Sequence, residues 1–591
     1  MRRLPLFALL PPLAACTTLP HPPPPPPPPE LAQAVANGPA AAGPVEVQIL
    51  ALNDFHGNLE PPQLSVPAIS GAVPAGGAAY LASALKSRRT TNSVTVAAGD
   101  LIGATPISSA LFLDEPSIMA LSEAGLDLAA VGNHEFDKGP AELLRMQKGG
   151  CDQHGTRKPC AVEPFAGAKF QYLAANVITA DGQTLLPGTA MKTIGGIRVG
   201  FIGMTLKQTA TLVSPDGVRG LTFADEATTA NAAVPVLRAA GAQAIVLLIH
   251  QGASITGSYH DRACPGLSGD ILPILDRLDP AIALVVSGHT HNAYICRVPS
   301  KGGGMRLLTS AGRYGAMVTD IRLQFDGGRL IGDKADFIVV QGEAIDTPRL
   351  KVPLSGAFPV FPADPAVAEI VDRYRTAAAP LANRAIGRLD GSVEKGEVDE
   401  ESTAAELISD GQLFVARALD RGAADFALMN NGGARTDLIP EADGTIRFGQ
   451  IFAMQPFANN LVTKSYTGDE IKAVLEQQFV IGDKDRSNPN LMAPSNNFAF
   501  AFDRSRPRGQ RIVSISLDGK PIDPKRSYRV TINNFLASGG DNFTTLAVGR
   551  DPVDGGLDLD ATEAYLATGP KAPQGGRIRD LTPKGWKPPK P

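Results

Sequence analysis

Between residues 45 and 345 the chain alternates short apolar runs with helical stretches, and no other feature constrains the fold as strongly. The apolar runs are rich in β-branched residues and are typical of buried strands; they span residues 45–52, 94–98, 128–131, 244–249 and 282–286. Helical stretches are expected between them, at residues 78–88, 116–123, 140–147 and 225–240. Strands that alternate with helices in this way indicate a layered α/β domain whose sheets are covered by helices.

A second region follows this domain. Asp364 and Pro365 are a typical helix start, and we interpret residues 346–385 as a connector that contains this helix. Residues 386–575 combine a helix at 401–418 with mixed strands and a glycine-rich stretch at 538–541. A chain of 591 residues is longer than one compact domain usually is, so two or more domains are expected, and the end from 576 to 591 is predicted to be disordered.

Composition excludes several classes of protein. Lys and Arg number 55 against 59 Asp and Glu, a balance that argues against a protein that coats nucleic acid with positive charge. A hydrophobic fraction of 43% excludes wholesale disorder. No apolar run approaches the roughly 20 residues that a membrane-spanning helix needs, so a polytopic membrane protein is excluded too.

The N-terminus reads as an export signal. Two arginines precede an apolar stretch at residues 4–13, and Leu13-Ala14-Ala15-Cys16 resembles a bacterial lipobox, in which the cysteine becomes the lipid-bearing first residue. We therefore predict a signal peptide at 1–15, lipidation of Cys16 and a proline-rich tether at 16–44. The alternative is an ordinary signal peptide that is cut elsewhere. Either implies export, and the lipid predicts a membrane-anchored protein in the periplasm or on the cell surface.

An exported chain folds in an oxidising compartment, so its cysteines are candidates for disulfides. Apart from Cys16 there are four, Cys151, Cys160, Cys264 and Cys296. Three pairings are possible, and proximity along the chain favours Cys151–Cys160 and Cys264–Cys296. Four free thiols are the alternative, whereas a zinc site of four cysteines is disfavoured because no C-x-x-C pair is present.

Five polar segments directly follow the apolar runs, where the loops of α/β folds place their sites. They are Asn53-Asp54-Phe55-His56-Gly57, Gly99-Asp100, Gly132-Asn133-His134-Glu135-Phe136-Asp137, His250-Gln251-Gly252 and Ser287-Gly288-His289-Thr290-His291. They hold five of the eight histidines of the chain. Carboxylate, imidazole and amide ligands suit Zn, Mn, Fe or Ni. In an extended Asp-x-His segment the two ligands would share one face, and the same geometry would direct both His289 and His291 inward. The neighbouring glycines permit tight turns and close backbone approach. Two such ions could clamp a phosphate and activate water.

Taken in order, these segments resemble the calcineurin-like metallophosphoesterases. The fuller similarity, over residues 45–570, is to the bacterial periplasmic 5′-nucleotidase/UDP-sugar hydrolase family. In the second region it rests on three stretches: Met429-Asn430-Asn431-Gly432-Gly433-Ala434-Arg435, Gln455-Pro456-Phe457-Ala458-Asn459 and Asn534-Phe535-Leu536-Ala537-Ser538-Gly539-Gly540-Asp541. The resemblance implies an N-terminal four-layer α/β-sandwich catalytic domain at 45–345, a linker helix, and a C-terminal α/β nucleotide-recognition domain at 386–575.

The same resemblance implies a role for each motif residue. One divalent ion, Zn, Mn or similar, would bind Asp54, His56, Asp100 and His291. A second would bind Asp100, Asn133, His250 and His289, with Asp100 bridging the two ions. His134 would stabilise developing charge or protonate the leaving oxygen, and Asp137 would orient His134.

For the second domain the resemblance implies nucleotide recognition. Phe457 and Phe535 would stack on the base, Asn459 and Asp541 would reach the base edge or the ribose, and Arg435 would meet the phosphate. Asn431 and Gly433 complete the expected substrate-binding set. The implied reaction is hydrolysis of nucleoside 5′-monophosphates by metal-activated water. A monomer that acts on a nucleotide or nucleotide sugar, and not on a nucleic-acid polymer, is expected.

One stretch departs from the family pattern. Some family members carry two more phosphate-binding arginines early in the second domain, where this chain has no arginine between Asp399 and Glu406. UDP-sugar hydrolysis or cleavage of 2′,3′-cyclic nucleotides therefore stays open, and Gln412 or Arg417 could compensate. A non-catalytic nucleotide-binding lipoprotein is the alternative from a different class.

Overall fold

The computed structural model describes residues 43–62, 65–68, 71–155, 157–346, 351–457, 459–481, 484–486 and 488–586. The predicted signal peptide, Cys16 and nearly all of the predicted tether lie outside these residues. Among the described residues, no helix combines the length and the apolar character that crossing a bilayer requires.

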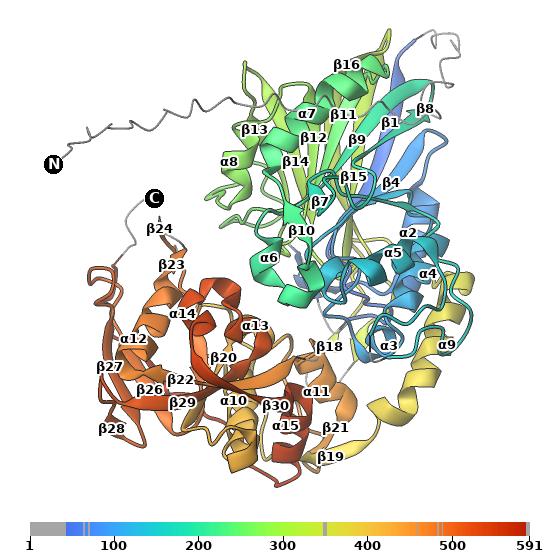
Figure 1. Ribbon diagram of the computed structural model, residues 1–591. Helices are drawn as coiled ribbons and strands as arrows, with labels where there is room; N and C mark the ends of the chain where they lie inside the picture. Colours follow the sequence, from blue (N-terminus) through green and yellow to red (C-terminus); the bar gives the residue numbers. More distant parts are fainter. Residues whose placement is uncertain are drawn as a thin grey trace, which may run out of the picture. The chain divides into compact units, whose positions relative to one another are not determined.

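The first half of the chain contains two six-stranded sheets (Figure 1). The first has the order β16-β15-β1-β4-β5-β6, with bounds β1 Val45–Leu52, β4 Ser93–Ala98, β5 Leu128–Ala130, β6 Gln171–Leu173, β15 Met317–Asp326 and β16 Arg329–Val339. The second has the order β13-β14-β12-β11-β9-β8, with bounds β8 Thr189–Ile194, β9 Ile197–Thr205, β11 Ala244–His250, β12 Ile282–Ser287, β13 Ala293–Pro299 and β14 Met305–Ala311. Strands β1, β4, β5 and β6 run parallel, as do β9, β11, β12 and β14.

The two sheets pack face to face, and each is covered by helices on its other face. Ile49 and Val96 of the first sheet share a core with Phe201 and Val246 of the second. The helices over the first sheet are α2 Ala78–Arg88, α4 Glu115–Ala124 and α5 Pro140–Lys148, and those over the second are α7 Glu226–Ala239 and α8 Ile271–Leu275. This is the predicted four-layer α/β sandwich. Strand β1 is buried on both faces, which explains its continuous apolar run.

Short elements complete this half. They are β2 Ser65–Ala68, β3 Gly71–Pro74, β7 Val177–Thr179, β10 Leu221–Phe223, α3 Ile107–Ala110, α6 Thr209–Leu212, β17 Ile345–Asp346 and β18 Lys351–Val352. Both predicted disulfides are confirmed, with Cα–Cα distances of 5.5 Å for Cys151–Cys160 and 5.8 Å for Cys264–Cys296.

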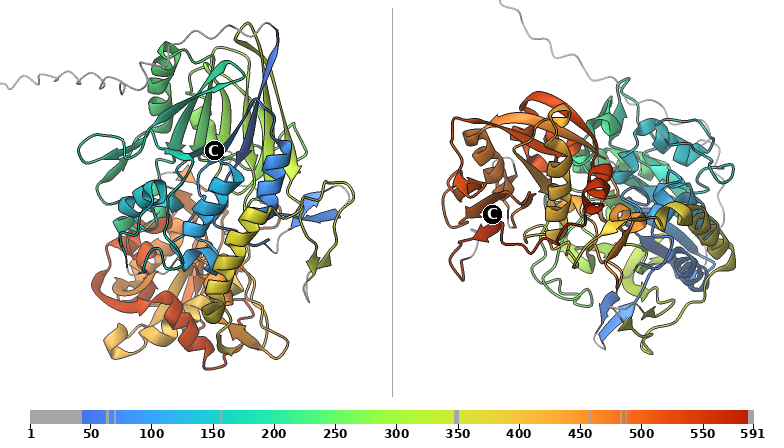
Figure 2. Two further views of the ribbon diagram at one scale, coloured as in Figure 1. Left: turned by 90° about the vertical axis from the view of Figure 1, so that its right-hand side faces the viewer. Right: turned by 90° about the horizontal axis from the view of Figure 1, so that it is seen from below.

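The predicted connector helix is α9, Pro365–Ala382. Its start has the predicted form, because the Asp364 side chain accepts a hydrogen bond from the Val367 backbone N–H at 3.2 Å and Pro365 takes the first helical position. Figure 2 shows α9 in yellow beside α2 and α4, with which it is in contact. The helix is therefore packed against the first half along part of its length.

The second half is built on a five-stranded and a four-stranded sheet. The first has the order β25-β20-β29-β22-β30, with bounds β20 Phe426–Asn430, β22 Asn460–Thr467, β25 Met492–Pro494, β29 Ser527–Asn533 and β30 Arg550–Leu557. The other has the order β28-β27-β26-β31, with bounds β26 Phe498–Phe502, β27 Ile512–Leu517, β28 Lys520–Pro521 and β31 Ile578–Asp580. Two-stranded pairs are β19 Ala385–Arg388 with β21 Thr445–Arg447, and β23 Val480–Ile481 with β24 Lys484–Asp485.

Helices cover these sheets, namely α10 Thr403–Ala416, α11 Phe448–Met454, α12 Gly468–Glu476, α13 Asn534–Ala537, α14 Thr544–Ala547 and α15 Asp558–Leu566. The helix predicted at 401–418 is α10, and the Ser402 hydroxyl caps it by accepting from the Ala405 N–H at 3.1 Å. The prediction of a disordered tail from residue 576 is wrong for its first part. Strand β31 pairs with β26, and Arg577 forms an ion pair with Asp410 at 2.9 Å, so burial and charge fix this segment.

Candidate active site

The five polar segments of the first half meet at one edge of the sandwich. They leave the carboxyl ends of the parallel strands β1, β4 and β5 of one sheet and β11 and β12 of the other, which places their side chains together. Three groups of side chains each bring their ligand atoms within 4.8 Å of one another: Asp54, His56 and His291; His56, Asp100 and His134; and Asp100, His250 and His289. Because the groups share members, they form one continuous cluster.

Asp100 occupies the centre of this cluster. Its Oδ2 lies 2.9 Å from His250 Nε2 and 3.6 Å from His56 Nε2. The carboxylate therefore lies between two flanks of the cluster, one that contains His250 and one that contains His56. On one flank His56 Nε2 lies 3.1 Å from His291 Nε2, and His291 Nε2 lies 3.4 Å from Asp54 Oδ1. Burial raises the pKa of Asp100, but the adjacent His250 and His134 outweigh it and hold the pKa well below its usual value. The carboxylate is thus charged in the folded protein.

The chemistry of these atoms fits divalent metal ions. The Nδ1–H groups of His56 and His250 donate to backbone carbonyls, those of Gly103 at 2.8 Å and Ala98 at 2.7 Å, which leaves each Nε2 directed at the cluster. Burial lowers the pKa of His250, but Asp100 outweighs burial and raises the pKa to about 10, so in the metal-free site a proton lies between His250 Nε2 and the carboxylate. A divalent cation bound there would take the place of that proton. Asn133 Oδ1 is also buried without a hydrogen-bond partner among the described residues. Nitrogen and oxygen donors of this kind suit Zn or Mn.

The backbone geometry differs from the extended Asp-x-His segments expected from the sequence. Asp54 and His56 have φ of 49° and 45°, and His289 and His291 have φ of 70° and 59°, all in the left-handed region. The expectation that these pairs share the face of an extended segment is therefore wrong, and it is tight turns that bring them together. Such conformations cost free energy and concentrate at functional sites.

A glycine beside the cluster is required for close packing. An added Cβ at Gly132 would lie 2.2 Å from Asp100 Oδ1 and 2.5 Å from the Asp100 backbone N. The loop after β5 can therefore approach Asp100 only because residue 132 has no side chain. The role that the sequence suggested for this glycine, a close backbone approach, matches the contact.

Glu135 is a site residue that the sequence analysis did not single out. Its buried carboxylate accepts hydrogen bonds from the backbone N–H groups of Asp100 at 2.9 Å, Leu101 at 2.7 Å and Gly132 at 2.6 Å. It therefore ties the loop after β4 to the loop after β5. The signal in the sequence was its place between His134 and Phe136 in the longest polar segment.

Replacing Glu135 by Gln is expected to weaken metal binding by about 10–100-fold, the usual cost of disturbing groups that orient ligands. The new amide would direct N–H groups at backbone N–H groups that need an acceptor. Titration of the metal-free protein with Mn²⁺ or Zn²⁺ measures the effect. Glu123→Gln, at a partly exposed position on α4, is the matched control, and equal affinities in the two variants would contradict this role.

His134 lies at the open side of the cluster. Its Nδ1 is 2.8 Å from Asp137 Oδ2, and its backbone N–H donates to Asp100 Oδ1 at 2.9 Å. Burial lowers the pKa of His134, but the carboxylates of Asp137 and Asp100 outweigh burial and raise it above its usual value. The imidazole is thus held in one orientation with its other nitrogen, Nε2, free to act on a ligand.

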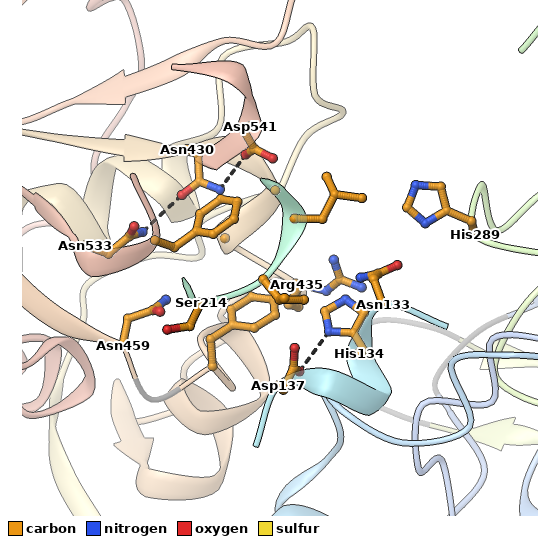
Figure 3. A pocket seen from close by; sticks show the side chains of 16 residues that line it. Asn133, His134, Asp137, Ser214, His289, Asn430, Arg435, Asn459, Asn533 and Asp541 are labelled. Atoms are coloured by element: carbon orange, nitrogen blue, oxygen red, sulfur yellow. Dashed lines mark hydrogen bonds and ion pairs between the residues drawn. The ribbon is translucent and has the colours of Figure 1, made fainter. Parts of the chain in front are cut away.

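A cavity of about 210 Å³ opens beside His134 and is lined from both halves of the chain (Figure 3). The ring of Phe457, from the second half, stacks on the His134 imidazole at 5.9 Å with an interplanar angle of 22°. The Arg435 guanidinium lies 5.7 Å from the centre of the same phenyl ring. The cavity also has a wall from Leu212, Val213 and Ser214, which the sequence did not indicate.

Six of the seven residues expected to contact a substrate from the second half line this cavity: Gly433, Arg435, Phe457, Asn459, Phe535 and Asp541. The seventh, Asn431, does not. Its amide donates to the backbone carbonyls of Glu400 at 2.6 Å and Val398 at 3.4 Å. Strand β20 ends at Asn430, and the next side chain turns away from the cavity.

Asn430 lines the cavity instead. Its Nδ2 donates to Asp541 Oδ2 at 2.9 Å, and its Oδ1 accepts from Asn533 Nδ2 at 3.1 Å, as Figure 3 shows. Gln412 and Arg417, considered as replacements for missing arginines, do not line it. The Gln412 amide contacts Met429 Sδ at 3.4 Å, and Arg417 caps the far end of α10.

Models of two known protein families match the two halves of the chain. The model of the calcineurin-like phosphoesterases matches residues 47–293, and that of the 5′-nucleotidase C-terminal domain matches residues 385–548. Endonuclease YhcR of Bacillus subtilis is 28% identical over 533 residues, 88% of this chain and 40% of that protein. Cell wall protein Lmo0130 of Listeria monocytogenes is 29% identical over 542 residues, 85% of this chain and 65% of that protein.

This chain therefore spans about 40% and 65% of the lengths of these two relatives. A solved structure, that of a 5′-nucleotidase precursor from Thermus thermophilus, superposes with a TM-score of 0.72 at 27% identity. The match covers 91% of this chain and 99% of that one, so the whole two-part arrangement is shared.

Proposed function

The chain belongs to the calcineurin-like phosphoesterases that carry a 5′-nucleotidase C-terminal domain, and from this we propose that it is a metal-dependent phosphohydrolase of nucleoside 5′-monophosphates. One observation carries the proposal. The cavity joins the metal-type cluster and His134 of the first half to Arg435, Phe457 and Phe535 of the second. A phosphate at the cluster and a base among the phenyl rings would fit this arrangement.

Two divalent ions, Zn, Mn or similar, are proposed to occupy the cluster. One would be held by Asp54, His56, Asp100 and His291, and the other by Asp100, Asn133, His250 and His289. When bound, such a pair draws negative charge from a phosphate and activates water for attack on phosphorus. The orphaned Asn133 oxygen and the two anchored imidazoles support this assignment.

Side chains of the protein would supply the remaining steps of leaving-group stabilisation and substrate binding. His134, oriented by Asp137, is proposed to stabilise or protonate the leaving oxygen from its place beside the cluster. Phe457 and Phe535 would stack on the base, and Asn459 and Asp541 would reach the base edge or the ribose. Arg435 would hold phosphate oxygens with its forked guanidinium.

We also propose an exported, monomeric protein with residues 45–345 as the catalytic domain, 346–385 as the connector and 386–575 as the recognition domain. The two disulfides support an oxidising compartment. Cleavage before Cys16 and lipidation of that cysteine would anchor the protein to a membrane through a proline-rich tether at 16–44. Mass spectrometry of the mature N-terminus tests this part.

Diesters are the second candidate class of substrate. The stretch from Asp399 to Glu406 lacks arginine, which weakens the provision for a fully charged phosphate. The relative from Bacillus subtilis is named an endonuclease, an enzyme that cleaves diesters. An experiment must therefore separate 5′-nucleotidase activity from three alternatives: UDP-sugar hydrolysis, 2′,3′-cyclic nucleotide cleavage and capture of nucleotides without turnover.

A metal-by-substrate panel separates them. The fragment that begins at Gly43 is stripped with EDTA, reloaded with Mn²⁺ or Zn²⁺, and assayed on AMP, UDP-glucose, 2′,3′-cyclic AMP and bis(p-nitrophenyl) phosphate. We expect EDTA to remove at least about 99% of activity and metal to restore it, because the ions supply several kcal/mol of transition-state stabilisation. Preference for the diester over AMP would overturn the monophosphate assignment. Hydrolysis of none of the four substrates would contradict the assignment as an enzyme.

A further inference from the structure

The ammonium group of Lys464 is buried in the second half of the chain. The residue lies in the middle of β22, and only 8% of its surface is exposed. Its Nζ donates hydrogen bonds to three backbone carbonyls, those of Ala537 at 2.8 Å, Leu546 at 3.1 Å and Ala547 at 3.1 Å. A protonated lysine has three N–H groups, so these carbonyls satisfy all of its donors. Lys464 therefore holds another backbone segment against β22.

That segment carries two of the residues proposed to bind the nucleoside. The three carbonyls stand at the ends of the short helices α13 and α14; Phe535 lies in α13, and Asp541 lies in the loop between the two helices. The backbone of this loop is left-handed at Asp541, with φ of 56°, and at Asn542, with φ of 68°. Such conformations cost free energy and persist only where the surrounding structure holds them. Lys464 supplies contacts of this kind on both sides of Asp541.

The ring of Phe535 packs directly on the same loop. An added Cβ at Gly540 would lie 2.5 Å from both Cε2 and Cζ of this ring. The backbone at residue 540 therefore supports the ring at close range. Because the packing leaves no gap, a displacement of the loop would also displace the ring.

Strand β22 connects this segment to the opposite side of the proposed nucleoside site. Its first residue, Asn460, directly follows Asn459, and Phe457 lies two residues earlier still. The Asn460 backbone N–H donates to Asn534 Oδ1 at 3.2 Å, at the end of the antiparallel pair formed by β22 and β29. Strand β22 thus contacts α13 at two points, through the Asn460 backbone at its start and through the side chain of Lys464.

We propose that Lys464 and Asn534 are positioning residues for the nucleoside part of the substrate. Both would act through the groups that contact the base and the ribose. Lys464 holds the segment with Phe535 and Asp541 to the strand that begins directly after Asn459, and Asn534 ties the same two parts together at the strand end. Together they set the separation of the two phenyl rings. The proposal rests on the proposed function and deepens it, because it concerns recognition of the base and the ribose and not the chemistry at the metal ions.

Calorimetric titration of the metal-loaded protein with adenosine measures nucleoside binding without turnover. For Lys464→Met we expect the affinity to fall about tenfold or more, because three hydrogen bonds from a charged group are lost. Asn534→Leu removes one acceptor and should weaken binding about threefold or more. Asn534→Asp keeps an acceptor oxygen and should recover most of that loss. Lys520→Met and Asn496→Leu, at exposed positions, are the matched controls.

Steady-state kinetics on two monoesters separate a positioning role from a general loss of structure. AMP and glycerol 3-phosphate both release an alkoxide, but only AMP has a ribose and a base. In Lys464→Met we expect KM for AMP to rise about tenfold while kcat changes less than about threefold, which is the signature of lost binding. The ratio of kcat/KM for AMP to kcat/KM for glycerol 3-phosphate should fall about tenfold. A general disturbance of the site would lower both values equally.

Unchanged adenosine affinity in a folded Lys464→Met variant, or an equal loss on the two monoesters, would overturn the proposal. If circular dichroism shows that Lys464→Met does not fold, the comparison of Asn534→Leu with Asn534→Asp decides the proposal. A parent protein that binds no adenosine would also overturn it. A parent protein that binds adenosine but releases no phosphate from AMP would instead overturn the proposed function, and the adenosine affinities of the variants would then decide the proposal alone.

Discussion

Replacement of Asp100 by Asn is expected to abolish phosphate release and to lower the metal content of the purified protein. Asp100 Oδ2 faces His250 Nε2 at 2.9 Å on one flank and His56 Nε2 at 3.6 Å on the other, so this carboxylate would contact both ions. The amide keeps the size of the side chain but loses the negative charge. Since bound ions supply several kcal/mol of transition-state stabilisation, kcat/KM should fall by about 10³-fold or more.

Metal analysis after gel filtration and steady-state kinetics on AMP measure the two effects together. Asp326→Asn, an identical chemical change at the exposed end of β15, controls for the substitution itself. Circular dichroism and thermal melting of both variants report on folding. Full activity with a full metal content in the Asp100 variant would exclude the bridging role.

The positions of the cluster residues could be predicted because they depend on local sequence. Apolar runs marked strands β1, β4, β5, β11 and β12, and the carboxyl ends of parallel strands meet at one edge. The left-handed backbone at Asp54 and His291 could not be predicted in the same way. It is imposed by the convergence of five loops, which no single segment encodes.

The residues that line the substrate cavity were harder to predict for two physical reasons. A shift of one residue changes the face that a side chain occupies at a strand end, and this is why Asn430 and not Asn431 lines the cavity. Contacts between segments far apart in sequence leave no local signal. Leu212, Val213 and Ser214 lie far in sequence from the other cavity residues, and only the tertiary structure brings them to the cavity.

Replacement of His134 by Gln is expected to slow catalysis strongly while metal remains bound. General acid–base groups contribute typically about 10²–10⁴-fold, so kcat on AMP should fall within that range. Asp137→Asn should cause a smaller loss, because the Nδ1 hydrogen bond at 2.8 Å orients the ring but does not touch the substrate. His154→Gln, in an exposed loop, is the matched control.

The choice of substrate tells which role His134 plays. The leaving group of AMP is an alkoxide that needs a proton, whereas p-nitrophenolate leaves without one. If His134 protonates the leaving oxygen, His134→Gln should impair AMP hydrolysis far more than hydrolysis of p-nitrophenyl phosphate. An equal loss on both substrates would indicate that His134 stabilises charge on the phosphoryl group instead. His134 also belongs to a cluster with His56 and Asp100, so a loss of bound metal in this variant would make it a ligand and contradict both catalytic roles.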